Sequence, residues 1–321
     1  MIEVKHFSES DLEFEQLTKI HNIVDHNFAI HFDDMKNKWE KRDKSLIRNK
    51  LLLYKDNILI GYISYSQGRK KNKKTVFFDV KLNPRYSNSM FYNILYKKML
   101  IEIKKFDCKK ILTTIYDHSN YDHSKKAILE NGFKLVQVNR EYCCDISNFT
   151  FEKYNYLFQK LELDGIKLYD SKNEMKNFPN HYIKLEELEW ICEQDIPIPK
   201  GVFHTREPFK KFLEDQKDYE DNYYGTQIVA VKDQQYIGAT DIYTFPKSEP
   251  HKAWTGTLGV LEKYRRRGIA TALKVKAIDI LSNKGITEIR TDNEENNPMY
   301  KINVSLGFLP EPFSYEYIKK I

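Results

Sequence analysis

Three consecutive arginines precede a glycine in the stretch YRRRGIA, residues 264–270. The segment before it, AWTGTLGVL at residues 253–261, is rich in Thr, Trp and Val and predicts a strand. After Gly268, apolar residues recur at helical spacing until Gly285, which predicts a helix. The first N–H groups of a helix lack intrahelical partners and its dipole favours an anion, so this strand-to-helix turn predicts a phosphate site. The arginines add positive charge around its rim.

A second strand and a short helix follow in ITEIRTDNEENNPMYKINVSLGF, residues 286–308. Residues 286–291 predict the strand, and Asn297 and Pro298 suit the N-cap and first position of the helix, which Gly307 would end. Strand, glycine turn, helix, strand and helix make one βαβα unit. We therefore expect an α/β fold in which helices flank a mixed sheet.

The glycine turn resembles the acetyl-CoA motif of the GNAT superfamily of acyl-CoA-dependent N-acetyltransferases. That motif runs Arg or Gln, two residues, Gly, one residue, and Gly or Ala, which Arg265, Gly268 and Ala270 match. A later pattern of the family places Asn three residues before a small or apolar residue and eleven before Gly-Phe, and here it begins at Asn296. The resemblance covers about residues 228–321. It implies acetyl-CoA as cosubstrate and an amine, on a small molecule or a peptide, as acceptor.

The resemblance also implies roles for individual residues. Leu258 and Val260 would pair with the pantetheine arm of CoA, and Asn296 would reach the same arm. The backbone of the turn would hold the pyrophosphate through Arg265, Arg266, Arg267, Gly268, Ile269, Ala270 and Thr271.

Acetyl transfer to an amine needs a base for the amine and a proton donor for the leaving thiolate. Asp241 is the candidate base, because it shares a strand face with apolar residues in YIGATDIY, where burial favours the neutral carboxyl. The alternative is that Asp241 only caps or pairs, and that a water chain serves as base. The family often has a Tyr donor seven residues after the Asn, where this chain has Asn303. Tyr300, one turn earlier, is the candidate acid, with a packing role as the alternative.

Two pairs of segments repeat at nearly equal spacing along the chain. YKDNILIGYISY at residues 54–65 echoes VKDQQYIGATDIY at residues 231–243, and ENGFKL around Gly132 echoes SLGFLP around Gly307. Each first segment predicts a strand, a short turn and a strand, and each second segment a helix stopped by glycine before a strand. The echoes predict a duplicated domain.

The two copies are unequal. The first lacks the arginines and has Met90 near the position that corresponds to Gly268. We therefore predict two tandem GNAT-like domains, a degenerate copy without a cofactor motif at residues 1–150 and a copy with the acetyl-CoA motif at residues 151–321. Tandem members of the family in which one copy has lost its motif are similar in organisation.

Composition limits the class of protein. Fifty-two Lys and Arg against forty-six Asp and Glu give a net charge of +6, which is small for 321 residues and predicts no nucleic-acid partner. No apolar run is long enough to cross a membrane, and the first thirty residues fit no signal peptide, so we expect a cytoplasmic protein, monomeric or homodimeric. The four cysteines lack CxxC spacing, and we expect no metal site.

Other readings of the sequence stay open. A catalytically weak acyl-CoA sensor or scaffold is the main alternative to an enzyme, and a basic nucleic-acid binder is disfavoured because the positive charge is scattered. Asp195 and Glu207 lie in a segment that would help to build the acceptor pocket. Either they recognise a cationic acceptor or they lie at solvated helix ends.

Overall fold

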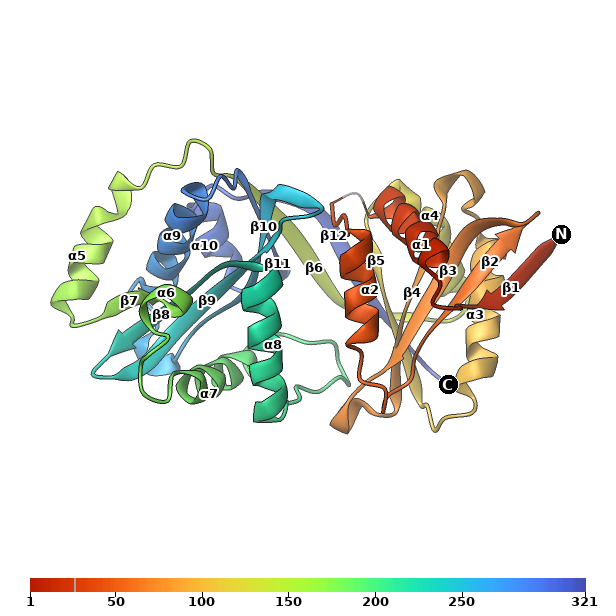
Figure 1. The fold of residues 1–321 in the computed structure, drawn as a ribbon, viewed down its shortest axis with the longest axis horizontal. Coiled ribbons are helices and arrows are strands. Elements are labelled where there is room, and N and C mark those ends of the chain that lie inside the picture. Colours follow the sequence, from red (N-terminus) through yellow and green to blue (C-terminus); the bar gives the residue numbers. More distant parts are fainter. Residues whose placement is uncertain (26) are drawn as a thin grey trace. The chain divides into compact units, whose positions relative to one another are not determined.

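The computed structural model describes residues 1–25 and 27–321 of the chain. These residues form two compact units, in which segments distant in the sequence come together (Figure 1). Unit 1 comprises Met1–Asn139, Ile198–Thr205 and Pro312–Ile321, and unit 2 comprises Arg140–Pro197 and Arg206–Glu311.

Unit 1 is built on a sheet with the strand order β1-β2-β3-β4-β5-β12. β4 and β5 are parallel, and the other neighbours are antiparallel. Helices α1 and α2 lie on one face of this sheet and α3 and α4 on the other (Figure 1). The elements are β1 (Ile2–His6), α1 (Asp11–Val24), α2 (Phe32–Glu40), β2 (Arg48–Lys55), β3 (Ile58–Gln67), β4 (Thr75–Leu82), α3 (Ser89–Ile103), β5 (Lys110–Tyr116), α4 (Asp122–Glu130) and β12 (Leu309–Lys320).

Unit 2 has the strand order β7-β8-β9-β10-β11, followed by β6, and its parallel pair is β10 and β11. Alternate residues of β8 face opposite layers: Ile228 and Ala230 join the core that contains α9, and Val229 joins the core that contains α7. The elements are β6 (Lys134–Asp145), α5 (Asn155–Leu163), β7 (Lys167–Asp170), α6 (Ser171–Glu174), α7 (His181–Glu193), α8 (Phe209–Asn222), β8 (Tyr224–Lys232), β9 (Gln235–Phe245), β10 (Glu249–Val260), α9 (Ile269–Ser282), β11 (Glu288–Glu294) and α10 (Tyr300–Ser305).

The predicted α/β fold with two tandem copies is confirmed, and the repeated segments adopt the same local geometry. The β2–β3 and β8–β9 hairpins both turn through two residues with positive φ, residues 56–57 and 233–234. Helices α4 and α10 both end at a glycine with positive φ, Gly132 at 77° and Gly307 at 91°.

The last strand of each copy is exchanged between the units. β12 follows α10 in the chain, yet Pro312–Ile321 belongs to unit 1, where β12 pairs antiparallel with β5 over residues 314–320 and 110–116. β6 follows α4, yet from Arg140 onwards it belongs to unit 2, beside β11. Compact units therefore do not coincide with the predicted sequence copies at residues 1–150 and 151–321, because strand pairing crosses that division.

Two element boundaries differ from the sequence prediction. The strand predicted at residues 286–291 is β11, shifted to Glu288–Glu294. The helix predicted to have Asn297 as its N-cap and Pro298 as its first residue is α10, which begins at Tyr300. The Asn297 side chain accepts a hydrogen bond from the Met299 backbone N–H at 3.0 Å, and so forms a turn before the helix.

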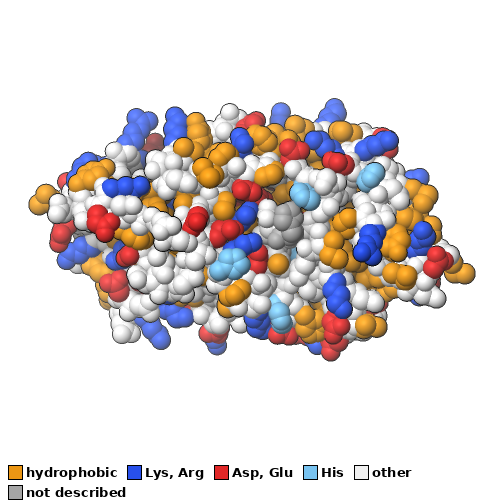
Figure 2. Space-filling model, turned by 90° about the horizontal axis from the view of Figure 1, so that it is seen from above, with side chains coloured by type: hydrophobic (Ala, Val, Ile, Leu, Met, Phe, Trp, Pro, Cys, Tyr) orange, Lys and Arg blue, Asp and Glu red, His pale blue; other side chains and the backbone are white. Residues whose placement is uncertain are grey.

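The surface charge and the arrangement of possible metal ligands and cysteines can also be described. On the face shown in Figure 2, acidic and basic side chains are interspersed. Within residues 1–25 and 27–321, no helix is long and apolar enough to cross a membrane, and no group of three or more His, Cys, Asp or Glu side chains is arranged to hold a metal ion. Cys108, Cys143, Cys144 and Cys192 are free thiols.

Candidate functional site

The site in unit 2 begins where β10 and β11 separate. These two parallel strands pair over residues 252–254 and 288–290 only, although β10 continues to Val260. A bulge between Thr255 and Leu258 shifts β10 against β9, and pairing with β9 resumes at Leu258. Among the described residues, β10 pairs with a strand on the β9 side only at residues 258–260, so its other edge has no strand partner there; of that edge, the Val260 carbonyl accepts a hydrogen bond from Arg265 Nε at 2.9 Å.

A cavity of about 590 Å³ lies at this edge. Its wall contains eight residues that the family resemblance assigns to CoA: Leu258, Val260, Arg265, Arg266, Gly268, Ile269, Ala270 and Thr271. The other residues of the wall come from the end of α7 and the segment after it, from β10 and the turn before α9, and from the segment before α10 and α10 itself: Cys192, Asp195, Ile196, Gly259, Tyr264, Asn297, Pro298, Met299 and Ile302. The volume suits a ligand of cofactor size.

The start of α9 supplies hydrogen-bond donors to the cavity. The N-cap is Gly268, and the first intrahelical bond joins the Ala272 N–H to the Gly268 carbonyl at 3.0 Å. The N–H groups of Ile269, Ala270 and Thr271 therefore precede the helical ladder and remain for an anion. This is the arrangement that the YRRRGIA stretch predicts.

Two residues expected to bind CoA lie outside the cavity wall. Among the described residues, Arg267 places its guanidinium 5.7 Å from the centre of the Tyr264 ring. Asn296 is exposed, and its backbone and side-chain N–H groups donate to the Glu294 carboxylate at 2.9 and 3.1 Å. Asn297 lies in the wall instead, one residue later.

Arg265 is held by two groups of unit 2. Its Nε donates to the Val260 carbonyl at 2.9 Å, and its guanidinium forms an ion pair with Asp195. The sequence left open whether Asp195 recognises a cationic acceptor or lies at a solvated helix end, and the structure gives it a third role, as the partner of Arg265. The pair orients one arginine at the cavity and neutralises part of its charge.

Gly268 is required by the backbone as well as by any ligand. Its φ is +89°, and a Cβ added there would lie 2.5 Å from Cδ1 of Leu157 on α5. A substitution at this position therefore strains the protein itself, and cannot by itself separate folding from ligand binding.

We expect Gly268→Ala to lower the free energy of unfolding by about 1–3 kcal/mol, through the left-handed backbone and the contact with Leu157. Gly285→Ala is the matched control, since its φ is +81° and nothing lies within 4 Å of an added Cβ. Urea unfolding should show a larger loss for Gly268→Ala than for Gly285→Ala. Equal losses would show that the Leu157 contact relaxes at no cost.

The candidate base Asp241 is buried on β9, with 6% of its surface exposed. Its Oδ1 accepts a hydrogen bond from the Thr257 N–H, within the bulge of β10, at 2.7 Å. A Cβ on Gly256 would collide with its Oδ2, so the carboxyl fits closely against that glycine. Burial raises the pKa of Asp241 to about 6, although hydrogen bonds from Thr257 and Tyr243 act in the opposite direction. Asp241 holds the bulge and is not in the cavity wall.

A second carboxyl, Glu189 on α7, was missed by the sequence analysis. Burial, followed by the negative charges of Asp241, Glu186 and Glu193, raises its pKa to about 8. Its Oε1 accepts a hydrogen bond from Gln227 Nε2 at 3.2 Å. It lies one helical turn before Cys192, which is in the cavity wall. Burial therefore raises the pKa of both carboxyls, and the negative charge of Asp241 contributes to the shift of Glu189.

The candidate acid Tyr300 is half-buried and packs against the core of unit 2. Asn303, three residues later, is 2% exposed; it accepts a hydrogen bond from Lys274 Nζ and donates one to Asn293 Oδ1 at 2.6 Å. Burial lowers the pKa of Lys274 to about 7. Neither Tyr300 nor Asn303 is among the described residues of the cavity wall.

Comparison with protein families gives a match in unit 2. The sequence profile of the acetyltransferase (GNAT) family matches residues 183–305, a range that contains most of α7, the bulge of β10, α9 and all of α10. The match to the GNAT family thus covers residues 183–305. All residues of the cavity wall at the start of α9 lie within this range.

Comparison with solved structures extends the likeness to the whole chain. A tandem GNAT protein from the clavulanic acid biosynthesis pathway is similar over 100% of this chain and 98% of its own, with a TM-score of 0.77 and 14% identity. A GCN5-related N-acetyltransferase from Sphaerobacter thermophilus is similar over 99% and 95%, with a TM-score of 0.70 and 12% identity.

A glucosamine N-acetyltransferase region of a fungal multi-domain β-N-acetylglucosaminidase is similar over 99% of this chain and 38% of the fungal chain, with a TM-score of 0.74 and 12% identity. A search of curated protein sequences finds no match. At these identities the structures establish the fold, and the chain has the fold of tandem GNAT proteins.

Proposed function

We propose that unit 2 is an acetyl-CoA-dependent N-acetyltransferase that acts on an amine. The observation that carries the proposal is the meeting of three features at one cavity: the free edge of β10, the N-terminus of α9 and the arginines before it. A helix N-terminus beside cationic side chains suits a pyrophosphate, and a free strand edge suits an amide-containing arm.

The residues of the cavity divide between these two parts of CoA. The N–H groups of Ile269, Ala270 and Thr271 would receive the pyrophosphate, with Arg266 adding charge at the rim. The β10 edge at Leu258 and Val260 would hold the pantetheine arm. Asn297 takes the place proposed for Asn296. When bound, acetyl-CoA would supply the acetyl group as a thioester.

The carboxyl pair of Glu189 and Asp241 would take the proton from the amine. A base is most effective when its pKa lies near the working pH. Burial raises the pKa of Glu189 to about 8 and the pKa of Asp241 to about 6. Glu189 is the better candidate, because Asp241 is occupied by the Thr257 N–H. The negative charge of Asp241 would then help to raise the pKa of Glu189. Tyr300 stays a candidate acid that would have to move from its packed position.

We expect kcat/KM to rise with pH between about 6 and 8, because the carboxyls act as bases only after they lose their protons. Glu189→Gln keeps an acceptor for Gln227 and should remove the upper part of this rise, with a loss on the order of 10–100-fold at pH 8. Comparing both proteins with one acceptor cancels the ionisation of the amine itself. An unchanged profile would exclude Glu189 as the base.

The same shift predicts an effect on stability that needs no substrate. A carboxyl with a raised pKa binds more protons in the folded than in the unfolded state between its ordinary value of 4.5 and about 8, so the free energy of unfolding falls as the pH rises through that window. Glu189→Gln should therefore stabilise the protein more at pH 8 than at pH 5, as measured by thermal melts.

The direct test is acetylation of an amine panel by the full chain with acetyl-CoA, read by mass spectrometry. The panel includes glucosamine, because a structurally similar fungal region acts on it. Calorimetry with CoA should give one site per chain, since unit 1 lacks the glycine and arginines of the α9 turn. Binding of CoA without acetylation of any amine would favour the sensor. Failure to bind CoA would overturn both functions.

A further inference from the structure

The sheet of unit 1 carries polar side chains on the face that α1 and α2 cover. Strand register places Lys50 opposite Ser64, and Ser64 opposite Asp79. Two residues further along β2 and β3, Arg48 lies opposite Ser66. Because side chains two residues apart share a face, these residues form one polar row across β2, β3 and β4. A sheet face that only packed against helices would be apolar.

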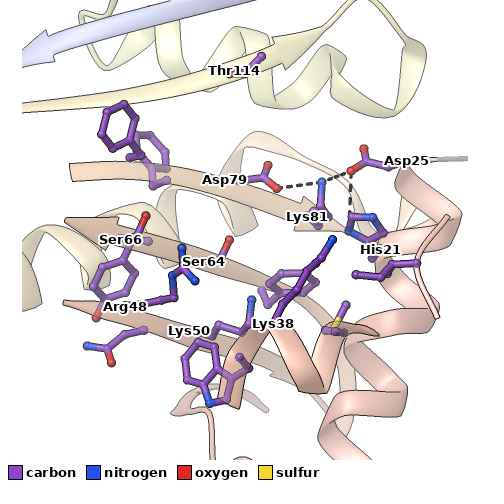
Figure 3. A pocket seen from close by; sticks show the side chains of 18 of the residues that line it. His21, Asp25, Lys38, Arg48, Lys50, Ser64, Ser66, Asp79, Lys81 and Thr114 are labelled. Carbon is purple, nitrogen blue, oxygen red and sulfur yellow. Dashed lines mark hydrogen bonds and ion pairs between the residues drawn. The ribbon is translucent and has the colours of Figure 1, made fainter. Parts of the chain in front are cut away.

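A cavity of about 530 Å³ lies over this row (Figure 3). Its wall is aromatic and apolar, and includes Met35, Trp39, Tyr62, Phe77 and Tyr116. Four basic side chains reach it, Lys38, Arg48, Lys50 and Lys81, against two acidic ones, Asp25 and Asp79. The cavity therefore has an apolar body and an excess of positive charge.

The acidic side chains of the cavity are already paired. Lys81 is 4% exposed and forms ion pairs with Asp25 and, at 2.8 Å, with Asp79, as the dashed lines of Figure 3 show. Tyr121 donates to Asp25 and His21 lies 3.8 Å from the same carboxylate. The carboxylates of Asp25 and Asp79 therefore already have a cationic partner in Lys81.

Lys50 and Arg48 on β2 have no such partner. Within the described part of the chain, neither side chain forms a hydrogen bond or an ion pair with a carboxylate. The Lys50 ammonium lies 5.5 Å from the centre of the Trp39 ring and 5.4 Å from that of Tyr62. Burial, followed in smaller part by the positive charges of Arg48 and Lys81, lowers its pKa to about 8, while the negative charge of Asp79 acts in the opposite direction. Trp39 is buried, and its indole N–H also has no acceptor among the described residues.

A half-buried ammonium such as that of Lys50, beside aromatic rings and without a hydrogen-bonded counter-ion among the described residues, is costly unless a ligand pairs with it. Arg48 is exposed and adds a second positive charge next to it. We propose that the cavity of unit 1 binds a small organic monocarboxylate with an apolar, ring-sized body. Its carboxylate accepts hydrogen bonds from Lys50 and Arg48, with Ser64 and Ser66 beside them, and its body packs against the aromatic wall. A dianion is disfavoured, because Asp79 lies only one strand beyond Ser64 in the row.

The test is calorimetric titration of the full chain with phenylacetate, 3-phenylpropionate and 4-methylpentanoate, each beside its neutral amide. We expect at least one acid to bind about tenfold or more tightly than its amide, and Lys50→Met to remove that preference. Lys50→Met keeps the apolar stem, so folding should be retained. Lys97→Met on α3, an exposed lysine, is the control and should bind as the unmodified chain does.

A second readout places the ligand. Trp39 is in the cavity wall and is one of three tryptophans, so a fluorescence change on binding should disappear in Trp39→Phe while calorimetry still detects binding. The proposal is overturned if no acid binds, if acid and amide bind equally, or if Lys50→Met leaves the affinity unchanged. It concerns unit 1 alone, so none of these results bears on CoA binding by unit 2.

Discussion

Thr271→Asp is expected to weaken CoA binding by ~100-fold or more without unfolding the protein. Thr271 is in the first turn of α9 and in the wall of the unit 2 cavity. An aspartate there would direct a negative charge at the pyrophosphate that the turn is proposed to hold, and like charges a few ångströms apart cost about 4 kcal/mol at an effective dielectric constant of 20. Calorimetric titration with CoA measures the loss.

The same substitution should leave the free protein intact or slightly more stable. An acidic residue in the first turn of a helix interacts favourably with its dipole when no anion is bound. Asparagine has nearly the same shape as aspartate but carries no charge. Thr271→Asn should therefore bind CoA with an affinity within about tenfold of that of the unmodified chain. Equal affinities of the Asp and Asn variants, with normal thermal melts, would contradict a phosphate site at this turn.

The turn before α9 shows how much of the site the sequence could predict. The strand, the glycine and the helix follow from local rules, and eight of the ten residues proposed for CoA lie in one cavity wall. What local rules could not give is the reason that Gly268 is glycine. The positive φ of Gly268 suits the predicted turn. The Leu157 side chain, which leaves no room for a Cβ at Gly268, belongs to α5, and α5 lies more than a hundred residues earlier in the sequence.

Glu189 could not be recognised as a candidate base from its position in the chain. Its raised pKa arises from burial in the fold and from Asp241 on another element. A signal was nevertheless present, since Glu186, Glu189 and Glu193 recur at helical spacing in a segment with buried residues. Three acids on one side of a half-buried helix are unusual unless they share protons or pair with cations.

The exchanged strands had no local signal at all. β6 and β12 are both predicted as strands, but nothing in their sequences states which sheet each one joins. That choice is made by long-range pairing, in which β12 joins β5 through register over seven residue pairs and buries Tyr317 in the core of unit 1. The sequence copies and the compact units are therefore different divisions of one chain.

This difference leads to opposite expectations for two fragments. Residues 140–311 contain the whole of unit 2, and should melt cooperatively and bind CoA within about threefold of the full chain. Residues 151–321 correspond to the predicted second copy, but lack Tyr142, Cys144 and Ile146 of the unit 2 core. Each buried side chain contributes about 1.5–3 kcal/mol, so their loss removes an amount comparable with the total stability of a domain.

Fragment 151–321 also carries β12 without β5, its partner in unit 1, and so exposes an unpaired strand with Tyr317. We expect it to aggregate, or to melt without cooperativity and bind no CoA. The two fragments have nearly equal lengths, so size does not explain a difference between them. A cooperative melt and normal CoA binding by residues 151–321, together with failure of residues 140–311, would show that the sequence copies, and not the units with exchanged strands, are the folding units.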